Sequence, residues 1–246
     1  MTGSGRAALT GPLQGGAPVV PRPSASLLVI DGGRRPWQVL MMRRPAGAEF
    51  APDAYVFPGG SVQPEDERWS DPCRAAAIRE TFEEVGILFA RGPGGRLASE
   101  RESRGVGEAL TRGLEFFQAL AEIGLQPAFD RLTLLTRWIT PEPMHRRFDT
   151  RFYLARRPGR QGVRPAPGEV VDCVWLSVSE ALAEGGPALV HATRRILETI
   201  DGAPDATALI ARLRRLPEPA PIRPVLRPRP DGAGYDVFDD ARPVFG

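Results

Sequence analysis

Three glutamates, Glu80, Glu83 and Glu84, lie close together in the segment RETFEEVGI, which spans residues 79–87. Carboxylates that converge on one point supply the oxygen ligands that a hard divalent cation such as Mg²⁺ takes, usually together with several waters. An acidic face in contact with solvent is the alternative interpretation of the same pattern. The choice depends on whether the surrounding segment is a helix that brings the three side chains to one side.

The flanking residues predict such a helix over residues 72–85. At about 100° per residue, four apolar side chains share one stripe opposite the glutamates: Ala75, Ile78, Phe82 and Val85. Asp71 supplies an N-cap, Pro72 a preset first residue, and Gly86 a left-handed C-terminal residue. The like-charge pairs of Glu80 should each destabilise an isolated helix by about 0.2–0.5 kcal/mol. A bound cation would remove that repulsion.

Length and composition favour one elaborated domain. The chain has 246 residues, and 32 basic residues face 30 acidic ones, so nothing indicates a nucleic-acid or membrane surface. Every basic residue is arginine, and the two cysteines, Cys73 and Cys173, are a weak basis for a disulfide framework. No signal-peptide core and no run of about 18 apolar residues occurs. We therefore expect a soluble cytoplasmic protein, either a monomer or a homodimer.

Strands and helices interleave along the chain, which predicts a mixed α+β class. Residues 24–31 and 36–44 read as a hairpin, and a short strand at 55–57 leads into Gly59 and Gly60. Further strand-like patterns cover 132–140, 146–157 and 169–178. Helical patterns cover 107–124, 188–201 and 205–215, with a short helix opening at Ser177 or Ser179.

The expected organisation has three parts. Residues 1–23 form a flexible segment, residues 24–216 form the domain, and residues 217–246 form an extended tail rich in Pro and Arg. The domain should carry a helical insertion at about 92–130, in which residues 91–105 are a loop and residues 107–124 an amphipathic helix.

The acidic segment resembles the motif of the Nudix hydrolases, G-x5-E-x7-R-E-U-x-E-E-x-G-U, in which U is aliphatic. Arg79 to Ile87 match its second half, with Thr81 at the first U position, and Asp71 takes the place of the first motif Glu. Gly60 precedes Asp71 by eleven positions instead of six, so residues 61–70 form an expanded loop. The resemblance implies a Nudix α/β/α sandwich around a mixed sheet.

The segments YVFPGGSV and RWITPEPMHRRFDTRFYLA look like one Nudix branch, that of the peroxisomal and mitochondrial coenzyme A diphosphatase called Nudix motif 19. By this resemblance, Glu83 and Glu84 would hold Mg²⁺ or Mn²⁺, and Glu80 would complete the metal shell or act through a bound water. Arg79 would orient Glu83, and Gly60 would offer its backbone carbonyl to the metal.

Four further residues are candidates outside the motif. Glu169 lies just before a strand and is a candidate general base, with an exposed loop acid as the alternative. Arg44, Arg146 and Arg147 are candidates for substrate binding, since a guanidinium fork matches phosphate geometry. Strand alternation would instead place Arg147 on a solvated face. We interpret two aromatic residues as core rather than base-stacking platforms, namely Trp138 and Phe148.

The predicted function is metal-dependent hydrolysis of a small-molecule nucleoside diphosphate linked to another group. Coenzyme A or acyl-coenzyme A is the first choice, and NADH, ADP-ribose and nucleotide sugars are alternatives. A ligand-sensing Nudix domain without turnover is a second class, and a nucleic-acid-binding protein lacks the expected basic stripe. We expect the middle of loop 61–70 to vary freely and to affect substrate choice, and helix 107–124 to wall a pantetheine channel.

Overall fold

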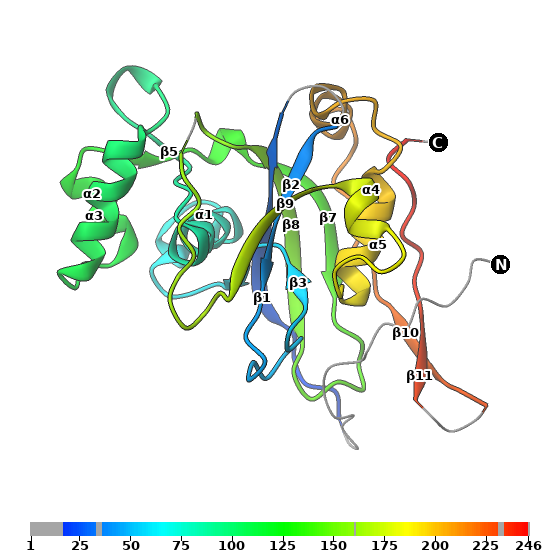
Figure 1. The fold of residues 1–246 in the computed structure, drawn as a ribbon. Coiled ribbons are helices and arrows are strands. Elements are labelled where there is room, and N and C mark those ends of the chain that lie inside the picture. The colour runs from blue at the N-terminus through cyan, green and yellow to red at the C-terminus, as the bar shows by residue number, and fades with distance from the viewer. Residues whose placement is uncertain (1–16, 33–35, 160, 231–233, 246) are drawn as a thin grey trace.

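The computed structural model describes residues 17–32, 36–159, 161–230 and 234–245. A mixed β-sheet stands at the centre, with helices on both of its faces (Figure 1). The predicted α+β class is therefore confirmed. Most of the predicted flexible segment, residues 1–16, lies outside the described residues, and the division of the chain at residues 23 and 216 stays a prediction.

The main sheet runs in the order β3-β2-β1-β8-β7, with β4 paired to β1 and β9 paired to β2. Its strands are β1 (Arg22–Asp31), β2 (Gln38–Arg43), β3 (Tyr55–Val56), β4 (Gly59–Ser61), β7 (Thr133–Ile139), β8 (Phe148–Arg156) and β9 (Asp172–Ser177). Only the pairing of β1 with β8 is parallel. The hairpin expected at 24–44 is confirmed by the antiparallel pairing of β1 with β2.

Strand β1 changes its partner along its length. Ser24 to Ser26 pair with β4, whereas Ile30 and Asp31 pair with β2. The first half of β1 thus holds the strand that contains Gly59 and Gly60 at the middle of the sheet. Alternate residues of a strand point to opposite faces, so β1 contributes to two cores. Leu27 and Val29 pack on one face, and Leu28 and Ile30 on the other.

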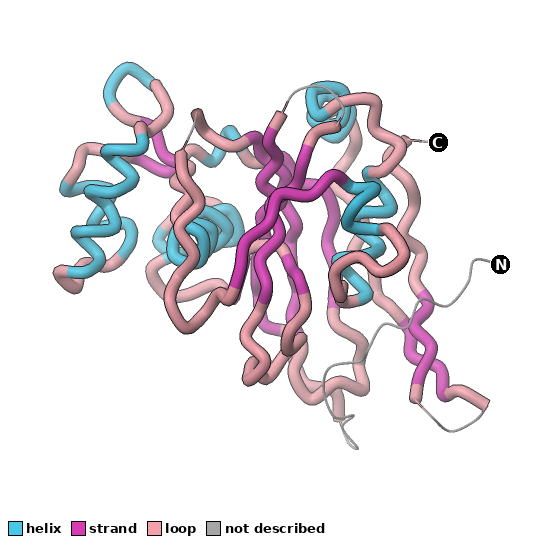
Figure 2. Tube along the Cα trace, in the orientation of Figure 1, coloured by secondary structure: helices cyan, strands magenta, loops and turns pink. Residues whose placement is uncertain are grey.

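The first face is covered by α1 (Pro72–Val85), which begins and ends where the sequence predicts. The second face is covered by α4 (Val178–Leu182), α5 (His191–Ile200) and α6 (Ala206–Leu213), as the tube in Figure 2 shows. These helices bury the apolar stripes of their sequences against the sheet, with Ile196, Leu197 and Leu209 fully buried. The predicted helices at 188–201 and 205–215 are confirmed with shorter ends.

The insertion after α1 differs from its prediction. It contains two helices, α2 (Glu100–Thr111) and α3 (Phe116–Glu122), instead of one helix at 107–124. Helix α2 begins early because Ser99 caps it. The Ser99 hydroxyl accepts the N–H of Glu102, and the Glu102 carboxylate accepts the backbone N–H of Ser99. Gly113, with a φ of 91°, turns the chain between the two helices.

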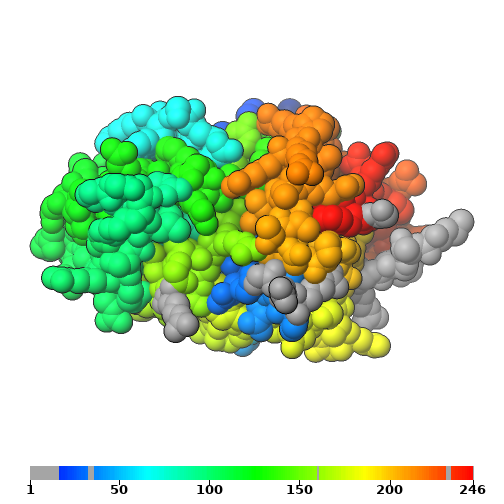
Figure 3. Space-filling model, turned by 90° about the horizontal axis from the view of Figure 1, so that it is seen from above, coloured from blue at the N-terminus to red at the C-terminus, as the bar shows by residue number. Residues whose placement is uncertain are grey.

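Short elements complete this side of the molecule. They are β5 (Ala90–Arg91), β6 (Gln126–Pro127) and three 3₁₀ turns at Asp66–Arg68, Pro93–Gly95 and Phe129–Arg131. Strands β5 and β6 pair with each other and tie the two ends of the insertion together. Seen from above, the insertion forms one end of the molecule and the α6 region lies toward the other (Figure 3).

The tail is more ordered than an extended segment. Ile222 bridges to Trp138 of β7, and the hairpin of β10 (Val225–Pro228) and β11 (Tyr235–Phe238) follows. The chain then returns to α5, where Val244 donates its N–H to the carbonyl of Thr199 at 2.8 Å. Within the described ranges, no helix has both the length and the apolar character that crossing a membrane would need.

Candidate active site

Helix α1 is fixed at both ends. The carboxylate of Asp71 accepts the N–H of Arg74 at 3.1 Å, and Gly86, with a φ of 71°, donates its N–H to Phe82. Both predicted caps are confirmed. The loop after β8 then covers the C-terminal carbonyls: Arg164 donates its backbone N–H to Val85 and Ala166 donates to Glu84. The last turn of α1, which carries the acids, is therefore held from outside as well as from within.

Two of the glutamates contact β4, the strand that contains Gly59 and Gly60. Glu84 is 8% exposed, and its Oε2 accepts the backbone N–H of Gly59 at 2.8 Å. A Cβ atom on Gly60 would lie 2.4 Å from Oε1 of Glu80, closer than real Cβ contacts come. A side chain at position 60 would therefore displace the carboxylate of Glu80. The Gly-Gly pair lies beside the acids, and a role for the Gly60 carbonyl as a metal ligand stays a prediction.

Arg79 is a buried hub among the acids. Its Nη1 donates to Glu80 at 2.9 Å and to Glu83 at 2.8 Å, and its Nη2 donates to the carbonyl of Ser61. Burial disfavours the charge of its guanidinium, but the hydrogen bonds to Asp66 and the neighbouring carboxylates outweigh that effect and raise the pKa of Arg79. The predicted role of Arg79 in orienting Glu83 is consistent with these contacts.

Asp66 is the acid that sequence reasoning missed. Its side chain is fully buried and accepts both Nε and Nη2 of Arg79, at 3.1 and 2.8 Å. Asp71, which we aligned with the first motif Glu, caps α1 instead. A signal was present, because Gly60 and Asp66 have the spacing G-x5-D that the motif gives to its first Gly and Glu. The loop expansion therefore follows Asp66 and does not precede the motif acid.

The expanded loop 61–70 faces the helical insertion. The ring of Trp69 lies 5.1 Å from that of Phe117 and 5.5 Å from that of Phe129, measured between centroids. Arg68 forms an ion pair with Glu115 at 3.2 Å. The C-terminal part of the loop is consequently anchored on the insertion.

Burial shifts the pKa values of the three acids of α1. It raises the pKa of Glu84 to about 8, against the N–H of Gly59, and raises the pKa of Glu83 to about 7, against Arg79. Burial also raises the pKa of Glu80. The charge of Glu169 adds to the effect on Glu80 and Glu84, so this acid lies in their neighbourhood. Burial thus disfavours the charged forms of all three carboxyls.

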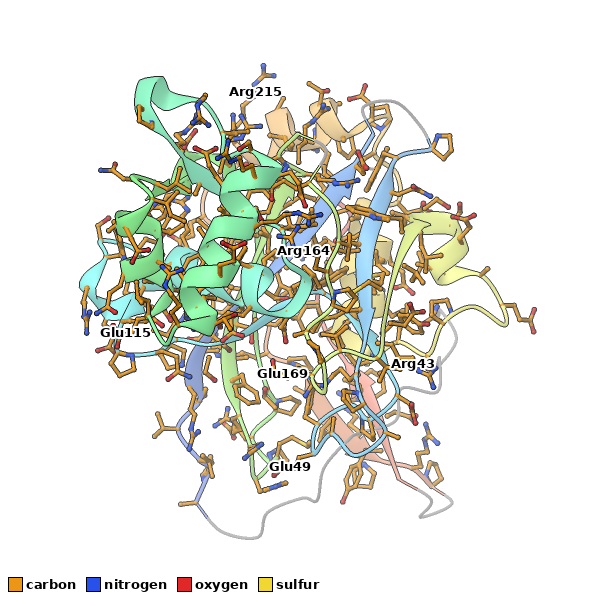
Figure 4. All side chains as sticks on the ribbon, turned by 60° about the vertical axis from the view of Figure 1, so that its left-hand side comes forward. Arg43, Glu49, Glu115, Arg164, Glu169 and Arg215 are labelled. Carbon is orange, nitrogen blue, oxygen red and sulfur yellow. The ribbon has the colours of Figure 1, made fainter. Side chains whose placement is uncertain are left out.

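Glu169 is an exposed residue on the loop that leads into β9 (Figure 4). Its backbone N–H closes a turn on the carbonyl of Ala166, the residue that also donates to α1. The loop thus links Glu169 to the C-terminal end of the acidic helix. Glu169 remains a candidate general base, and its exposure is what the alternative interpretation as a loop acid also predicts.

A cavity of about 390 Å³ begins at the other side of β4. Gly59, Gly60 and Ser61 line it, whereas Glu80 and Glu84 contact the same strand from the side of α1. Two of the predicted substrate-binding arginines line the cavity, Arg44 and Arg146. The acidic cluster and the cavity therefore share one wall of glycine backbone.

The arginines of this region have distinct settings. Arg44 donates its Nε to the carbonyl of Phe50 and opposes the raised pKa of Glu84 by its charge. Arg146 pairs with Glu49 at 2.7 Å near the surface. The structure does not bring Arg147 into the cavity, because its guanidinium donates to the carbonyls of Thr140 and Val19.

The walls of the cavity also differ from the prediction. No residue of α2 or α3 lines it, so this cavity does not have the wall expected at 107–124; the insertion packs beyond α1 instead (Figure 1). Trp138 is a core residue, as interpreted, and it also lines the cavity, as does Phe148. Val237, from the C-terminal hairpin, lines it as well.

The donor set is suited to a hard divalent cation, although no closed cage is present. Among the described residues, no three Asp, Glu, His or Cys side chains come together closely enough to hold an ion by themselves. Arg79 holds Glu80 and Glu83, and Gly59 holds Glu84, so the expected convergence of three carboxylates is not observed. Mg²⁺ is usually bound by one or two carboxylates, waters and substrate phosphates. The carboxylate oxygens of Glu80 and Glu84 beside β4 fit that mode.

Comparison with known families agrees with this site. The model of the NUDT19 Nudix domain matches residues 69–185, and that of the NUDIX domain matches residues 20–111. Together the two models cover residues 20–185, and this part of the chain is a Nudix domain. Both Nudix matches include α1 with its acidic cluster, and the more specific one extends from loop 61–70 through β9 to α4.

Individual Nudix proteins show the same likeness. A Caenorhabditis elegans protein provisionally named nudix hydrolase 7 is 31% identical over 163 residues, which cover 66% of this chain and 54% of that protein. The Gallus gallus acyl-coenzyme A diphosphatase NUDT19 is 28% identical over 238 residues, covering 65% of this chain and 62% of the relative. The chain thus spans little more than half the length of these curated relatives.

A solved structure supports the fold. The crystal structure of a NUDIX hydrolase from Alicyclobacillus acidocaldarius superposes with a TM-score of 0.63 and 26% sequence identity. The match covers 78% of this chain and 96% of that chain. The predicted Nudix sandwich is therefore confirmed.

Proposed function

We propose that this Nudix chain hydrolyses the diphosphate bond of a nucleoside diphosphate joined to a second group. The buried glutamates of α1 that press on Gly59 and Gly60, at the wall of the cavity, carry this proposal. The substrate we propose is coenzyme A or acyl-coenzyme A, with 3′-phosphoadenosine 5′-phosphate and (acyl-)phosphopantetheine as products. The likeness to relatives named acyl-coenzyme A diphosphatase supports that choice.

The acids of α1 would hold Mg²⁺ or Mn²⁺, with the carbonyl of Gly60 as a further ligand. When bound, such a cation neutralises charge on diphosphate oxygens and lowers the pKa of water. Arg79 keeps Glu80 and Glu83 in fixed positions by its two short hydrogen bonds. Glu169, on the loop joined to α1, would accept the proton of the attacking water.

The cavity would hold the rest of the substrate. Its volume, about 390 Å³, falls within the range of small-molecule sites. Arg44 and Arg146 line it and present guanidinium groups, which match the geometry of phosphate oxygens. The third candidate, Arg147, is occupied by backbone carbonyls and is left out of the proposed site.

The test is a substrate screen with Mg²⁺ or Mn²⁺, followed by mass identification of the products. We expect kcat/KM for coenzyme A to exceed the values for 3′-dephospho-coenzyme A, NADH and ADP-ribose by tenfold or more, about 1.4 kcal/mol. A clear preference for NADH or ADP-ribose would replace coenzyme A as the substrate. Turnover that persists in excess EDTA would contradict the metal dependence, and no turnover of any compound would favour a ligand-sensing domain.

A further inference from the structure

The cavity extends well beyond its glycine wall. It runs across the face of the sheet from β4 and β1, past Phe148 and Phe152 of β8, to Trp138 of β7 and the first turn of α5. Two strand spacings separate β1 from β7, which amounts to about 10 Å. A ligand whose diphosphate lies at β4 would therefore reach the α5 end with the group attached to that diphosphate.

The α5 end contains a hydrogen-bond donor that the protein does not satisfy. Trp138 is 5% exposed and lines the cavity, and its indole Nε1 is buried with no acceptor among the described residues. Buried polar groups of this kind usually have partners, and leaving one without a partner costs about 1–3 kcal/mol. An unpaired indole N–H on a residue that lines a cavity is a donor that a bound molecule could satisfy.

The helix beside Trp138 offers donors of the same kind. Helix α5 has ten residues and starts after Val190, and no side chain caps it. Its first three residues all line the cavity: His191, Ala192 and Thr193. The backbone N–H groups of a first helical turn have no partners within the helix. Trp138 and the first turn of α5 thus line one region of the cavity from two elements.

The surroundings select an uncharged acceptor. Arg195, one turn into α5, is paired with Asp239 and Glu198, and Asp239 also contacts His191 at 2.7 Å. The charges near this end are therefore already balanced. Four phenylalanines also line the cavity: Phe50, Phe57, Phe148 and Phe152.

We propose that Trp138 and the first turn of α5 bind an uncharged hydrogen-bond acceptor, a ring nitrogen or an amide carbonyl, on the group that the substrate carries beside its diphosphate. This inference rests on the proposed function, because it names part of the same substrate. In coenzyme A, the acceptor could belong to the adenine ring or to the pantetheine amides. Binding measurements with the two product fragments distinguish the adenine ring from the pantetheine amides.

Trp138→Phe removes the indole N–H and keeps an aromatic ring. Trp175→Phe is the matched control, since Trp175 of β9 does not line the cavity and packs against Arg157 at 5.3 Å. We would titrate 3′-phosphoadenosine 5′-phosphate and phosphopantetheine calorimetrically into each protein with Mg²⁺ present. We expect Kd for one fragment to rise three- to tenfold in Trp138→Phe, the size of one hydrogen bond, and to stay unchanged in Trp175→Phe.

A second pair of variants tests the site without touching the core. Val237→Trp adds bulk to the cavity wall from β11, whereas Val225→Trp adds it to β10 at a position that is 57% exposed and outside the cavity. The same fragment should bind more weakly to Val237→Trp alone. Wild-type affinity for both fragments in Trp138→Phe and Val237→Trp, or no binding of either fragment to the wild type, would overturn the inference.

These outcomes are separable from those of the proposed function. Normal hydrolysis of coenzyme A together with unchanged fragment binding in Trp138→Phe would contradict the proposed acceptor site and would still support the proposed hydrolase. Fragment binding that responds to Trp138→Phe in a protein that hydrolyses no diphosphate would remove the hydrolase and leave the acceptor site.

Discussion

Arg79 has two kinds of partner, and they serve different purposes. Asp66 is fully buried and binds the guanidinium through two hydrogen bonds, so it compensates the buried charge permanently. Glu80 and Glu83 each use one oxygen on Arg79. Their remaining lone pairs stay available to a ligand. Arg79 can thus position these two acids only while Asp66 holds it in place.

Replacing Asp66 should therefore be far more harmful than replacing Asp71. Asp66→Asn leaves a buried arginine with less compensation, and breaking a buried pair costs about 3–5 kcal/mol. We expect a large fall in the free energy of unfolding and a loss of hydrolysis of tenfold or more. Asp71→Asn keeps a good N-cap and should change stability by less than about 0.5 kcal/mol. Denaturant unfolding and kcat measurements check both, and equal effects would restore Asp71 as the motif acid.

Replacing the acids themselves should lower activity without lowering stability. Glu83→Gln or Glu84→Gln is expected to lower kcat by orders of magnitude while the fold stays intact. At position 84 the glutamine oxygen can still accept the N–H of Gly59 without burying a charge, so the metal-free variant should melt at or above the wild-type midpoint. Glu122→Gln, on the insertion, is the control and should leave kcat unchanged. Full activity in Glu84→Gln would remove that residue from the site.

At the scale of elements, the expanded loop and the helical insertion form one packed unit. The ring of Trp69 packs at an angle against Phe117 and edge-on against Phe129. The backbone N–H of Phe117 donates to the carboxylate of Glu65, next to Asp66. The insertion thereby supports the loop that holds Arg79. The insertion thus supports the candidate site through the loop that contains Asp66, and it does not line the cavity.

A double-mutant cycle measures this packing. Trp69→Ala and Phe117→Ala should each destabilise the protein, and together by less than the sum, with an interaction energy of about 0.5–1.5 kcal/mol. Trp69→Ala combined with Phe50→Ala is the control, because Phe50 lines the cavity and packs on Phe148. That pair should be additive within about 0.5 kcal/mol. Additivity of Trp69 with Phe117 would mean that loop and insertion are independent.

Elements with strong local signals were predictable from the sequence. The Asp-Pro start and Gly86 end of α1 are visible as residue types, and the apolar run of β1 fits a strand buried on two faces. A helical insertion was predicted, but the start of α2 was not, because the capping pair Ser99 and Glu102 lies in a polar stretch that reads as a loop. Asp66 was missed because its partner Arg79 is distant along the chain, and only tertiary packing brings them together.

At the scale of the whole molecule, the buried side chain of Asp239 joins the tail to α5, together with the backbone hydrogen bond from Val244 to Thr199. Asp239 is 3% exposed and accepts hydrogen bonds from Arg195, His191 and the N–H of Ala241. Burial opposes its charge, but these bonds outweigh burial and lower the pKa of Asp239. The hairpin that carries Val237 is therefore fastened to α5, directly beside the cavity.

The sign of the pH dependence follows from that shift. A carboxyl with a depressed folded pKa contributes stability above its unfolded pKa, about 3.9, and loses it as the pH falls toward the folded value. We expect Asp239→Asn to cost about 1–3 kcal/mol near pH 7, with the difference from wild type shrinking below pH about 4. Asp236→Asn, which breaks a more exposed pair with Arg229, should cost less than about 1 kcal/mol. A difference that grows on acidification would contradict this account.

Binding of a cation should stabilise the whole fold by mass action. At a hundred times Kd, a ligand adds about 2.7 kcal/mol, which raises the midpoint of a chain of this size by about 5–10 °C. Thermal unfolding with and without Mg²⁺ measures the rise, which should shrink in Glu83→Gln and Glu84→Gln. An undiminished rise in both variants would place the cation elsewhere.

The position of the acids within α1 has an electrostatic consequence. Glu83 and Glu84 occupy the last turn of a helix that ends at Val85. The aligned peptide dipoles of a helix place about half a negative charge at its C-terminus, where they favour cations and disfavour anions. The dipole and the carboxylates therefore repel a bare diphosphate together. A diphosphate reaches this end of α1 most readily as a complex with its cation, so the field of the helix imposes an order of binding before any chemistry begins.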